Sequence, residues 1–270
     1  MALQMSAVLA QIHDELRYEP VSQRIRASLG EQLVVETTSA MLVWEPRRVV
    51  PSYAVPRDDL RAELLELDLP PDDPADSPPV LVPGRFGPHL SEGRVVSLRV
   101  ADTTLDGAGF AFADPAMAGH VLLDWDRFTW VEESATMTGH AQDPFKYIKT
   151  LPSDRHVVVS LDGEVLAETR RSVLLLETSL PPRWYIPAED VRMELLEPSS
   201  KHTICAYKGR ASYWSVRGAE HGRDLAWFYP DPLHDAAPVK DLICFWVERS
   251  DLAIDGVAVP RPRSVFSENP

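Results

Sequence analysis

Residues that could do chemistry gather in one stretch of the second half of the chain. Thr203–Val216 reads TICAYKGRASYWSV and Leu225–Pro232 reads LAWFYPDP. A thiol becomes a better nucleophile when nearby cations lower its pKa, and the same cations can bind an oxyanion. We therefore predict Cys205 as a catalytic nucleophile, with Lys208 and Arg210 clamping an anionic substrate.

Aromatic side chains surround this stretch. Neighbouring residues of a strand face opposite sides, so Tyr213 and Trp214 cannot both point into one pocket. About half of the aromatic set then belongs to the core, and the rest lines an apolar pocket with a few donors. We predict that Tyr213, Trp227 and Tyr229 bind the substrate. Tyr185 is an alternative to the thiol as the catalytic nucleophile or acid.

Several known catalytic patterns do not match these residues. Cysteine phosphatases need Cys-x5-Arg, but Arg210 follows Cys205 one residue too early. Nucleotidyl transfer commonly uses paired carboxylates that hold Mg²⁺, and neither half of the chain shows such a pair after a Gly-Ser turn. Ser212 and Ser215 have no histidine nearby in the sequence, so no catalytic triad is inferred. The alternative interpretation of Cys205, and the one adopted for Cys244, is a small buried apolar side chain.

Cysteine and histidine usage argues against a metal centre or a disulfide framework. Cys205 and Cys244 are the only cysteines of the chain, and they form no Cys-x-x-Cys pair. The eight histidines are scattered, with no pair spaced to share one helix face. We expect a chain without a metal ion or another cofactor.

Net charge limits the partners. The 270 residues carry a formal net charge of −14. An acidic surface repels phosphate backbones and anionic lipids, so we expect no nucleic-acid and no membrane partner. A local basic pocket still suits a small anionic molecule, and the sequence leaves a protein partner open. No apolar run approaches the ~18 residues of a membrane span and the N-terminus lacks the basic flank of a signal peptide, which predicts a cytoplasmic protein.

The two halves of the chain are copies of one unit. Residues 26–66 and 158–197 match collinearly, and the similarity resumes downstream. Chance does not produce collinear matches at this density. The matched pairs are Ser28-Leu29 with Ser160-Leu161, Glu36-Thr37 with Glu168-Thr169, Glu45 with Glu177, Val55-Pro56 with Ile186-Pro187, Gly93-Arg94 with Gly209-Arg210, Asp114-Pro115 with Asp231-Pro232, and Trp130–Ser134 with Trp246–Ser250.

Short strands and tight turns are predicted to build each unit. Asp162-Gly163 predicts a hairpin between Val157–Ser160 and Val165–Glu168, because this turn needs positive φ at both central residues. Pro187–Leu195 predicts a short helix, with proline at its start and acidic residues in its first turn. Met5–Arg17 predicts a capping helix. The further predicted strands are Val173–Glu177, Arg210–Arg217, Leu225–Tyr229 and Leu242–Val247.

The first copy lacks the thiol, the ammonium group and the aromatic side chains of the motif. The alignment places His89 opposite Cys205 and Glu92 opposite Lys208. A motif needed only for folding would persist in both copies, which favours a ligand site in the second copy. The alternative is drift at positions that one copy no longer needs. Residues 68–92 add a Pro- and Asp-rich stretch that predicts a mobile surface loop.

Three runs of the second copy resemble a known family. ETSLPPRWYIPAEDVRMELL, CAYKGRASYWSV and AWFYPDP resemble the domain of unknown function 427 family. The resemblance is strong over Arg155–Pro270 and weaker but collinear over Arg24–Thr150. It implies a compact fold of the β-tent kind, whose other members often hold zinc through Cys-x-x-Cys pairs that this chain lacks. Ala206 departs from the family, in which proline usually follows the cysteine. The nucleotidyltransferase-like family name finds no support in the residues.

These observations predict a mainly β fold made of two tandem β-tent-like repeats with short helices. The expected parts are an N-terminal helical extension over residues 1–23, a first repeat over 24–150 and a second repeat over 151–270. The first functional hypothesis is a small-molecule-binding protein that hydrolyses a phosphorylated or otherwise anionic metabolite through the second repeat, as a phosphoester hydrolase and not a nucleotidyltransferase. The alternative is a non-catalytic binding or scaffold protein with duplicated interaction faces.

Overall fold

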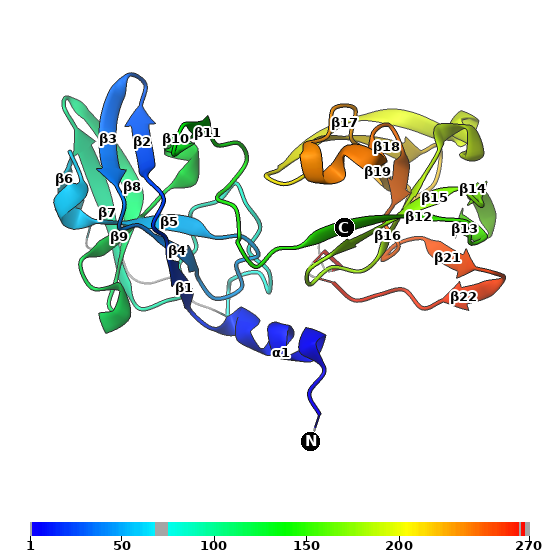
Figure 1. Cartoon of the computed structure of the whole chain (residues 1–270), viewed down its shortest axis with the longest axis horizontal. Coiled ribbons are helices and arrows are strands. Elements are labelled where there is room, and N and C mark those ends of the chain that lie inside the picture. Colours follow the sequence, from blue (N-terminus) through cyan, green and yellow to red (C-terminus); the bar gives the residue numbers. More distant parts are fainter. Residues whose placement is uncertain (1, 68–74, 265, 268–270) are drawn as a thin grey trace. The chain divides into compact units, whose positions relative to one another are not determined.

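Short antiparallel strands are the main regular structure of the chain. A computed structural model describes residues 2–67, 75–264 and 266–267 (Figure 1). The chain divides into two compact units, Met1–Asp143 and Pro144–Pro270. Each unit holds one seven-stranded and one four-stranded sheet. The prediction of a mainly β fold with tandem repeats and short helices is confirmed.

In the described part of the first unit, helical structure is limited to one short helix and a few 3-10 turns. They are α1 (Met5–Gln11), η1 (Ile12–Asp14), η2 (Arg57–Asp59), η3 (Pro115–Met117) and η4 (Trp125–Arg127). The strands are β1 (Arg17–Pro20), β2 (Ile25–Leu29), β3 (Gln32–Thr37), β4 (Met41–Trp44), β5 (Ser52–Pro56), β6 (Glu63–Glu66), β7 (Gly93–Val100), β8 (Thr103–Phe112), β9 (His120–Leu123), β10 (Thr129–Glu132) and β11 (Ala135–Thr136).

The second unit is again made of strands joined by 3-10 turns. The turns are η5 (Ala188–Asp190), η6 (Met193–Leu195) and η7 (His234–Val239). The strands are β12 (Ile148–Ser153), β13 (Val157–Leu161), β14 (Glu164–Thr169), β15 (Ser172–Glu177), β16 (Arg183–Ile186), β17 (Leu196–Cys205), β18 (Gly209–Val216), β19 (Ala226–Phe228), β20 (Ile243–Phe245), β21 (Asp251–Ile254) and β22 (Val257–Val259). No described helix has the length and apolar character needed to cross a membrane.

Strand order repeats from one unit to the other. The seven-stranded sheets run β1-β4-β5-β9-β8-β7-β6 and β12-β15-β16-β20-β19-β18-β17. The four-stranded sheets run β3-β2-β10-β11 and β14-β13-β21-β22. Each strand of the first unit therefore has a counterpart at the same place in the second. The duplication inferred from matched dipeptides extends to the whole topology. The predicted match of Trp130–Ser134 with Trp246–Ser250 is wrong, because Trp130 lies on β10, whose counterpart is β21, whereas Trp246 follows β20, the counterpart of β9.

The main core of each unit joins its two sheets. In the second unit Val157, Val159 and Leu161 of β13 are buried and pack with Ile186 and Phe245 of the larger sheet. The residues between them on β13 are half-buried, as the alternation of side chains along a strand requires. A second, separate cluster occupies the other face of the seven-stranded sheet. This second face carries the predicted site.

The predicted hairpin and the predicted strands are present. β13 and β14 pair around Asp162 and Gly163, whose φ angles are 51° and 85°. Both values lie in the left-handed region that this turn needs. β18 pairs with β19, and β20 is buried throughout, as the strand predictions required.

Neither predicted helix has its predicted extent. Pro187–Leu195 forms two 3-10 turns because Val191 between them is extended and bridges to the sheet. Arg192 N donates to the Leu166 carbonyl at 2.9 Å, and Val191 bridges to Ala167. Pairing with β14 therefore overrides the local helix signal. The N-terminal helix stops at Gln11 and is followed by η1, since the chain enters β1 at Arg17.

The Pro- and Asp-rich stretch of the first unit is anchored where the structure describes it. Residues 68–74 of the predicted mobile loop lie outside the described residues. Beyond them, the Arg48 guanidinium donates to the carbonyls of Arg85 (2.8 Å), Phe86 and Pro88 (3.1 Å). Leu81 is buried, and its N–H donates to the Arg47 carbonyl at 2.8 Å. This part of the stretch is thus tied to the β4–β5 connection, because an arginine and backbone groups satisfy its carbonyls.

Candidate functional site

The predicted aromatic site residues lie together on one sheet face of the second unit. Tyr185, Tyr213, Trp227 and Tyr229 belong to one buried cluster, which also contains Ala236 and Val239 of η7. Trp214 instead packs against the core between the sheets. The prediction that Tyr213 and Trp214 face opposite sides is therefore confirmed.

Two lysines share one buried carboxylate beside this cluster. Lys208 Nζ donates to Glu177 Oε2, and Lys146 Nζ lies 3.4 Å from Glu177 Oε1. Lys146 also donates to the Thr178 carbonyl at 3.1 Å. The Glu177 side chain is only 5% exposed. Sequence reasoning missed Glu177 and Lys146 as site residues, although the match of Glu177 to Glu45 was an available signal.

All three groups of this ion cluster are charged at neutral pH. Burial alone would raise the pKa of Glu177, but Lys208 and Lys146 outweigh it and hold that pKa below its ordinary value. Burial alone would lower the pKa of Lys208, but Glu177 and Cys205 outweigh it and raise that pKa. Two ammonium groups and one carboxylate (+2 − 1) leave the cluster with a net charge of +1. The surplus positive charge favours a bound anion nearby.

Cys205 lies at the edge of this ion cluster. It ends β17 opposite Gly209, so the turn between them ends in Lys208. Gly209 has φ +91°, and a Cβ there would approach the Asp231 carbonyl oxygen to 3.2 Å, which explains a glycine at this turn. The Cys205 side chain interacts with the Lys208 ammonium and is partly accessible, whereas Cys244 is buried.

Arg210 does not join Lys208 at this site. Its side chain is exposed, and it precedes Ala211, which belongs to the aromatic cluster, so Arg210 faces the other side of the sheet. Lys208 is buried on Glu177. The two cations therefore do not converge on one anion, and Lys146 is the second cation that the structure brings to Lys208.

A serine–histidine contact lies on the same side as Arg210. Ser212 Oγ is 3.3 Å from His202 Nδ1, directly across the β17–β18 pair. The same nitrogen is 3.3 Å from the Ala211 carbonyl, which can only accept a proton. The tautomer of His202 decides whether Nδ1 donates to this carbonyl or accepts from the Ser212 hydroxyl.

The tyrosines of the cluster differ in their hydrogen bonds. Trp227 Nε1 donates to the Tyr185 hydroxyl at 3.2 Å, and the Tyr213 hydroxyl is 2.9 Å from Thr203 Oγ1. The Tyr229 hydroxyl has no hydrogen-bond partner among the described residues. Burial raises the pKa of Tyr185 and of Tyr229 well above the ordinary value. Both phenols are therefore protonated donors at neutral pH, and Tyr185 fits the role of an acid better than that of a nucleophile.

A second buried ion pair, Arg183 with Glu248, contacts tryptophan rings of the aromatic cluster. Arg183 donates to both carboxylate oxygens of Glu248 at 2.7 Å. Its guanidinium also lies 5.5 Å from the Trp227 ring centroid and 5.0 Å from that of Trp246. Ser264 Oγ donates to Glu248 at 2.6 Å. Sequence reasoning missed this pair, because Arg183 and Glu248 are 65 residues apart and no local pattern links them.

The first unit keeps the buried carboxylate but changes its partners. Glu45 is fully buried, with Arg48 Nε at 3.2 Å from Oε2 and His89 Nδ1 at 3.1 Å from both oxygens. The His89 ring stacks on Phe110 with centroids 4.1 Å apart. An arginine and a histidine thus contact the carboxylate in the first copy, whereas two lysines contact it in the second.

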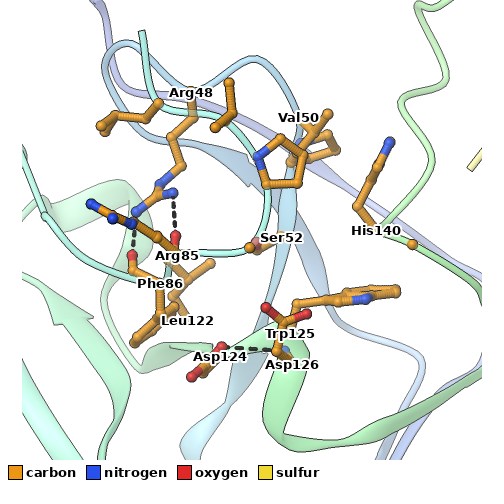
Figure 2. Close-up of a pocket in the computed structure, with 16 residues that line it drawn as sticks. Arg48, Val50, Ser52, Arg85, Phe86, Leu122, Asp124, Trp125, Asp126 and His140 are labelled. Atoms are coloured by element: carbon orange, nitrogen blue, oxygen red, sulfur yellow. Dashed lines mark hydrogen bonds between the residues drawn. The ribbon is translucent and has the colours of Figure 1, made fainter. Parts of the chain in front are cut away.

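A hollow of the first unit lies beside the anchored Pro-rich stretch (Figure 2). Residues 81–86 form one wall, and Ser52, Leu122, Trp125 and His140 lie around the rest. The Arg48 guanidinium at its edge is turned toward the carbonyls of Arg85 and Phe86 (Figure 2). Because these hydrogen bonds use its donors, the Arg48 guanidinium anchors the Pro-rich stretch and does not bind an anion.

Neither unit gathers metal ligands in its described part. No group of three or more His, Cys, Asp or Glu side chains that could hold a metal ion occurs among the described residues. The donors of the second unit's site are two ammonium groups, one carboxylate, one thiol and phenols. Ammonium groups cannot ligate a metal ion, so this donor set suits an anion.

Comparison with known proteins gives one family match. The family model described as a domain of unknown function (DUF427) matches residues 17–69 and 149–256. The two matched segments cover strands that are equivalent in the two units, which agrees with the repeated topology. No curated protein matches the chain.

Proposed function

The chain belongs to the domain of unknown function 427 family, and we propose that its second repeat binds a small anionic molecule and hydrolyses a phosphoester of it without a metal ion. Cys205 is the nucleophile in this proposal, and Lys208 with Lys146 supplies the positive charge. The single observation that carries the proposal is the net charge of +1 on the largely buried Lys146–Glu177–Lys208 cluster. A buried charge in excess is costly unless an opposite charge compensates it.

The reaction uses groups that the site already holds. The Cys205 sulfur attacks the phosphorus, an S–P bond forms, and the bond from phosphorus to the ester oxygen breaks. The leaving alcohol takes up the proton that the thiol gives up. Water then cleaves the S–P bond, which releases inorganic phosphate and restores the thiol. The ammonium groups stabilise the negative charge on sulfur and on the phosphoryl oxygens.

Binding is tested by thermal unfolding with inorganic phosphate and phenyl phosphate. A ligand at ~100 times its dissociation constant adds about 2.7 kcal/mol to the free energy of unfolding. We expect this gain in the wild type and its loss in Lys208→Met, which removes the surplus charge. Lys149→Met, at an exposed position of β12, is the matched control and keeps the gain. No gain in the wild type rejects the proposal.

Turnover is tested with 4-nitrophenyl phosphate. Cys205→Ser abolishes release of nitrophenol if the thiol is the nucleophile, whereas Cys244→Ala leaves it unchanged. Binding without any turnover would keep the anion site and reject the hydrolase.

The second candidate is a non-catalytic binding or scaffold protein. It is favoured by the burial of Tyr185, Tyr213 and Trp227 and by the hydrogen bonds that all three make within the fold. In that case the cluster serves packing, and neither phosphate nor phenyl phosphate changes the unfolding temperature.

A further inference from the structure

Tyr229 differs from the other polar groups of the second repeat's sheet face. Its side chain is 5% exposed, yet its hydroxyl has no hydrogen-bond partner among the described residues. Tyr229 is not among the described residues with a fully buried side-chain polar atom that lacks a hydrogen-bond partner. Those residues are His13, Arg24, Arg26, Ser91 and Ser172. The Tyr229 hydroxyl oxygen therefore reaches accessible space from an otherwise buried side chain.

The first repeat shows that packing does not need this hydroxyl. Phe112 stands two residues before Asp114-Pro115, as Tyr229 stands two residues before Asp231-Pro232. Strand register gives the same equivalence, since Phe110 pairs with Leu122 as Trp227 pairs with Cys244. Phe112 is buried in the apolar cluster of its own sheet face. A phenyl ring thus fills this place in one copy, and the second copy adds only the oxygen.

Tyr229 lies on the cluster face, near the turn that carries Lys208. Tyr229 follows Phe228, which pairs with Ser212, so the register sets Tyr229 beside Ala211 on the cluster face. The segment after Tyr229 contacts the Lys208 turn, where Leu233 N donates to the Lys208 carbonyl at 3.2 Å. Tyr229 also interacts electrostatically with Cys205 and Glu177.

We propose that Tyr229 is a ligand-binding residue whose hydroxyl donates a hydrogen bond to an oxygen of the bound anion. This inference rests on the proposed anion site at Lys208. It specifies the ligand class as an oxyanion with at least two acceptor oxygens, one for the ammonium and one for the phenol. Because burial keeps the phenol protonated, it acts as a neutral donor and adds no charge of its own.

Titration calorimetry with inorganic phosphate and phenyl phosphate tests the inference on the full chain. A hydrogen bond to a charged acceptor predicts about tenfold weaker binding in Tyr229→Phe. The unfolding temperature without ligand stays at or above the wild-type value, because phenylalanine already fills the equivalent place in the first repeat. Tyr18→Phe, a partly exposed tyrosine of the first unit, is the control and binds like the wild type.

The outcomes separate this inference from the proposed function. Weaker binding in Tyr229→Phe with unchanged stability supports the hydrogen bond. Equal affinity in the wild type and Tyr229→Phe, with loss of binding in Lys208→Met, overturns the role of Tyr229 and leaves the anion site intact. Absence of phosphate and phenyl phosphate binding in the wild type overturns both.

Discussion

Lys208 and Glu177 form an ion pair although the strands that carry them are far apart in the order of the seven-stranded sheet. Glu177 ends β15, Lys208 lies in the β17–β18 turn, and β16, β20 and β19 separate them in the strand order. The sheet must curl to bring them together. Glu45 and His89 repeat the relationship in the first unit, where β5, β9 and β8 intervene between β4 and β7. The curl is thus a property of the repeat, and the partners of the carboxylate are what changed between copies.

Replacing the shared carboxylate should strongly destabilise the second unit. Glu177→Gln leaves the Lys208 and Lys146 ammonium groups largely buried without a counter-charge, which costs about 3–5 kcal/mol. Urea denaturation measures the change in the free energy of unfolding. Glu197→Gln, whose carboxylate is exposed, is the control and should stay within about 0.5 kcal/mol of the wild type. A similar small effect for both variants would contradict the role of Glu177.

The ion cluster predicts a loss of stability at both ends of the pH range. The pKa of Glu177 is lowered, so its contribution is full above the ordinary carboxyl pKa and disappears as pH falls through the lowered value. The pKa of Lys208 is raised, so its contribution is full below the ordinary lysine pKa and disappears as pH rises through the raised value. Unfolding temperatures of wild type and Glu177→Gln should differ most near neutral pH and converge toward both extremes. A constant difference would refute the linkage.

The two cysteines should differ in reactivity. Burial raises the pKa of Cys244 to about 12, so this thiol is neutral and sealed in the folded protein. Cys205 is partly accessible beside an ammonium group. Native iodoacetamide treatment followed by mass spectrometry should therefore give one label, located on Cys205, and none in Cys205→Ser. Labelling of Cys244 without denaturant would show that the aromatic cluster opens readily.

Arg183 should not tolerate lysine. The guanidinium makes two hydrogen bonds to Glu248 and lies over two tryptophan rings, and lysine can reproduce neither feature. Arg183→Lys should cost about 1–3 kcal/mol, because one buried carboxylate oxygen loses its arginine donor. It should also change the near-ultraviolet circular dichroism of the tryptophans. Arg210→Lys, at an exposed position, provides the comparison and should leave both the unfolding free energy and the spectrum unchanged.

Repeated and local features could be read from the sequence. Matched dipeptides revealed the duplication, and alternating apolar residues with Asp162-Gly163 predicted the strands and one hairpin correctly. Such signals depend on residues close together in the chain, and backbone preference decides them. The opposite orientation of Tyr213 and Trp214 followed for the same reason.

Tertiary structure decided what those residues do. Val191 is extended and Arg192 N donates to the Leu166 carbonyl, because β14 supplies partners that a local helix signal does not take into account. Arg210 is two residues from Lys208 in sequence but faces the other side of the sheet, whereas Lys146 is 62 positions away (208 − 146) and shares its carboxylate. The curl of the sheet selects these partners, and it arises from the packing of all its strands. Sequence alone therefore determined the repeat and its strands, and the fold determined which charges meet.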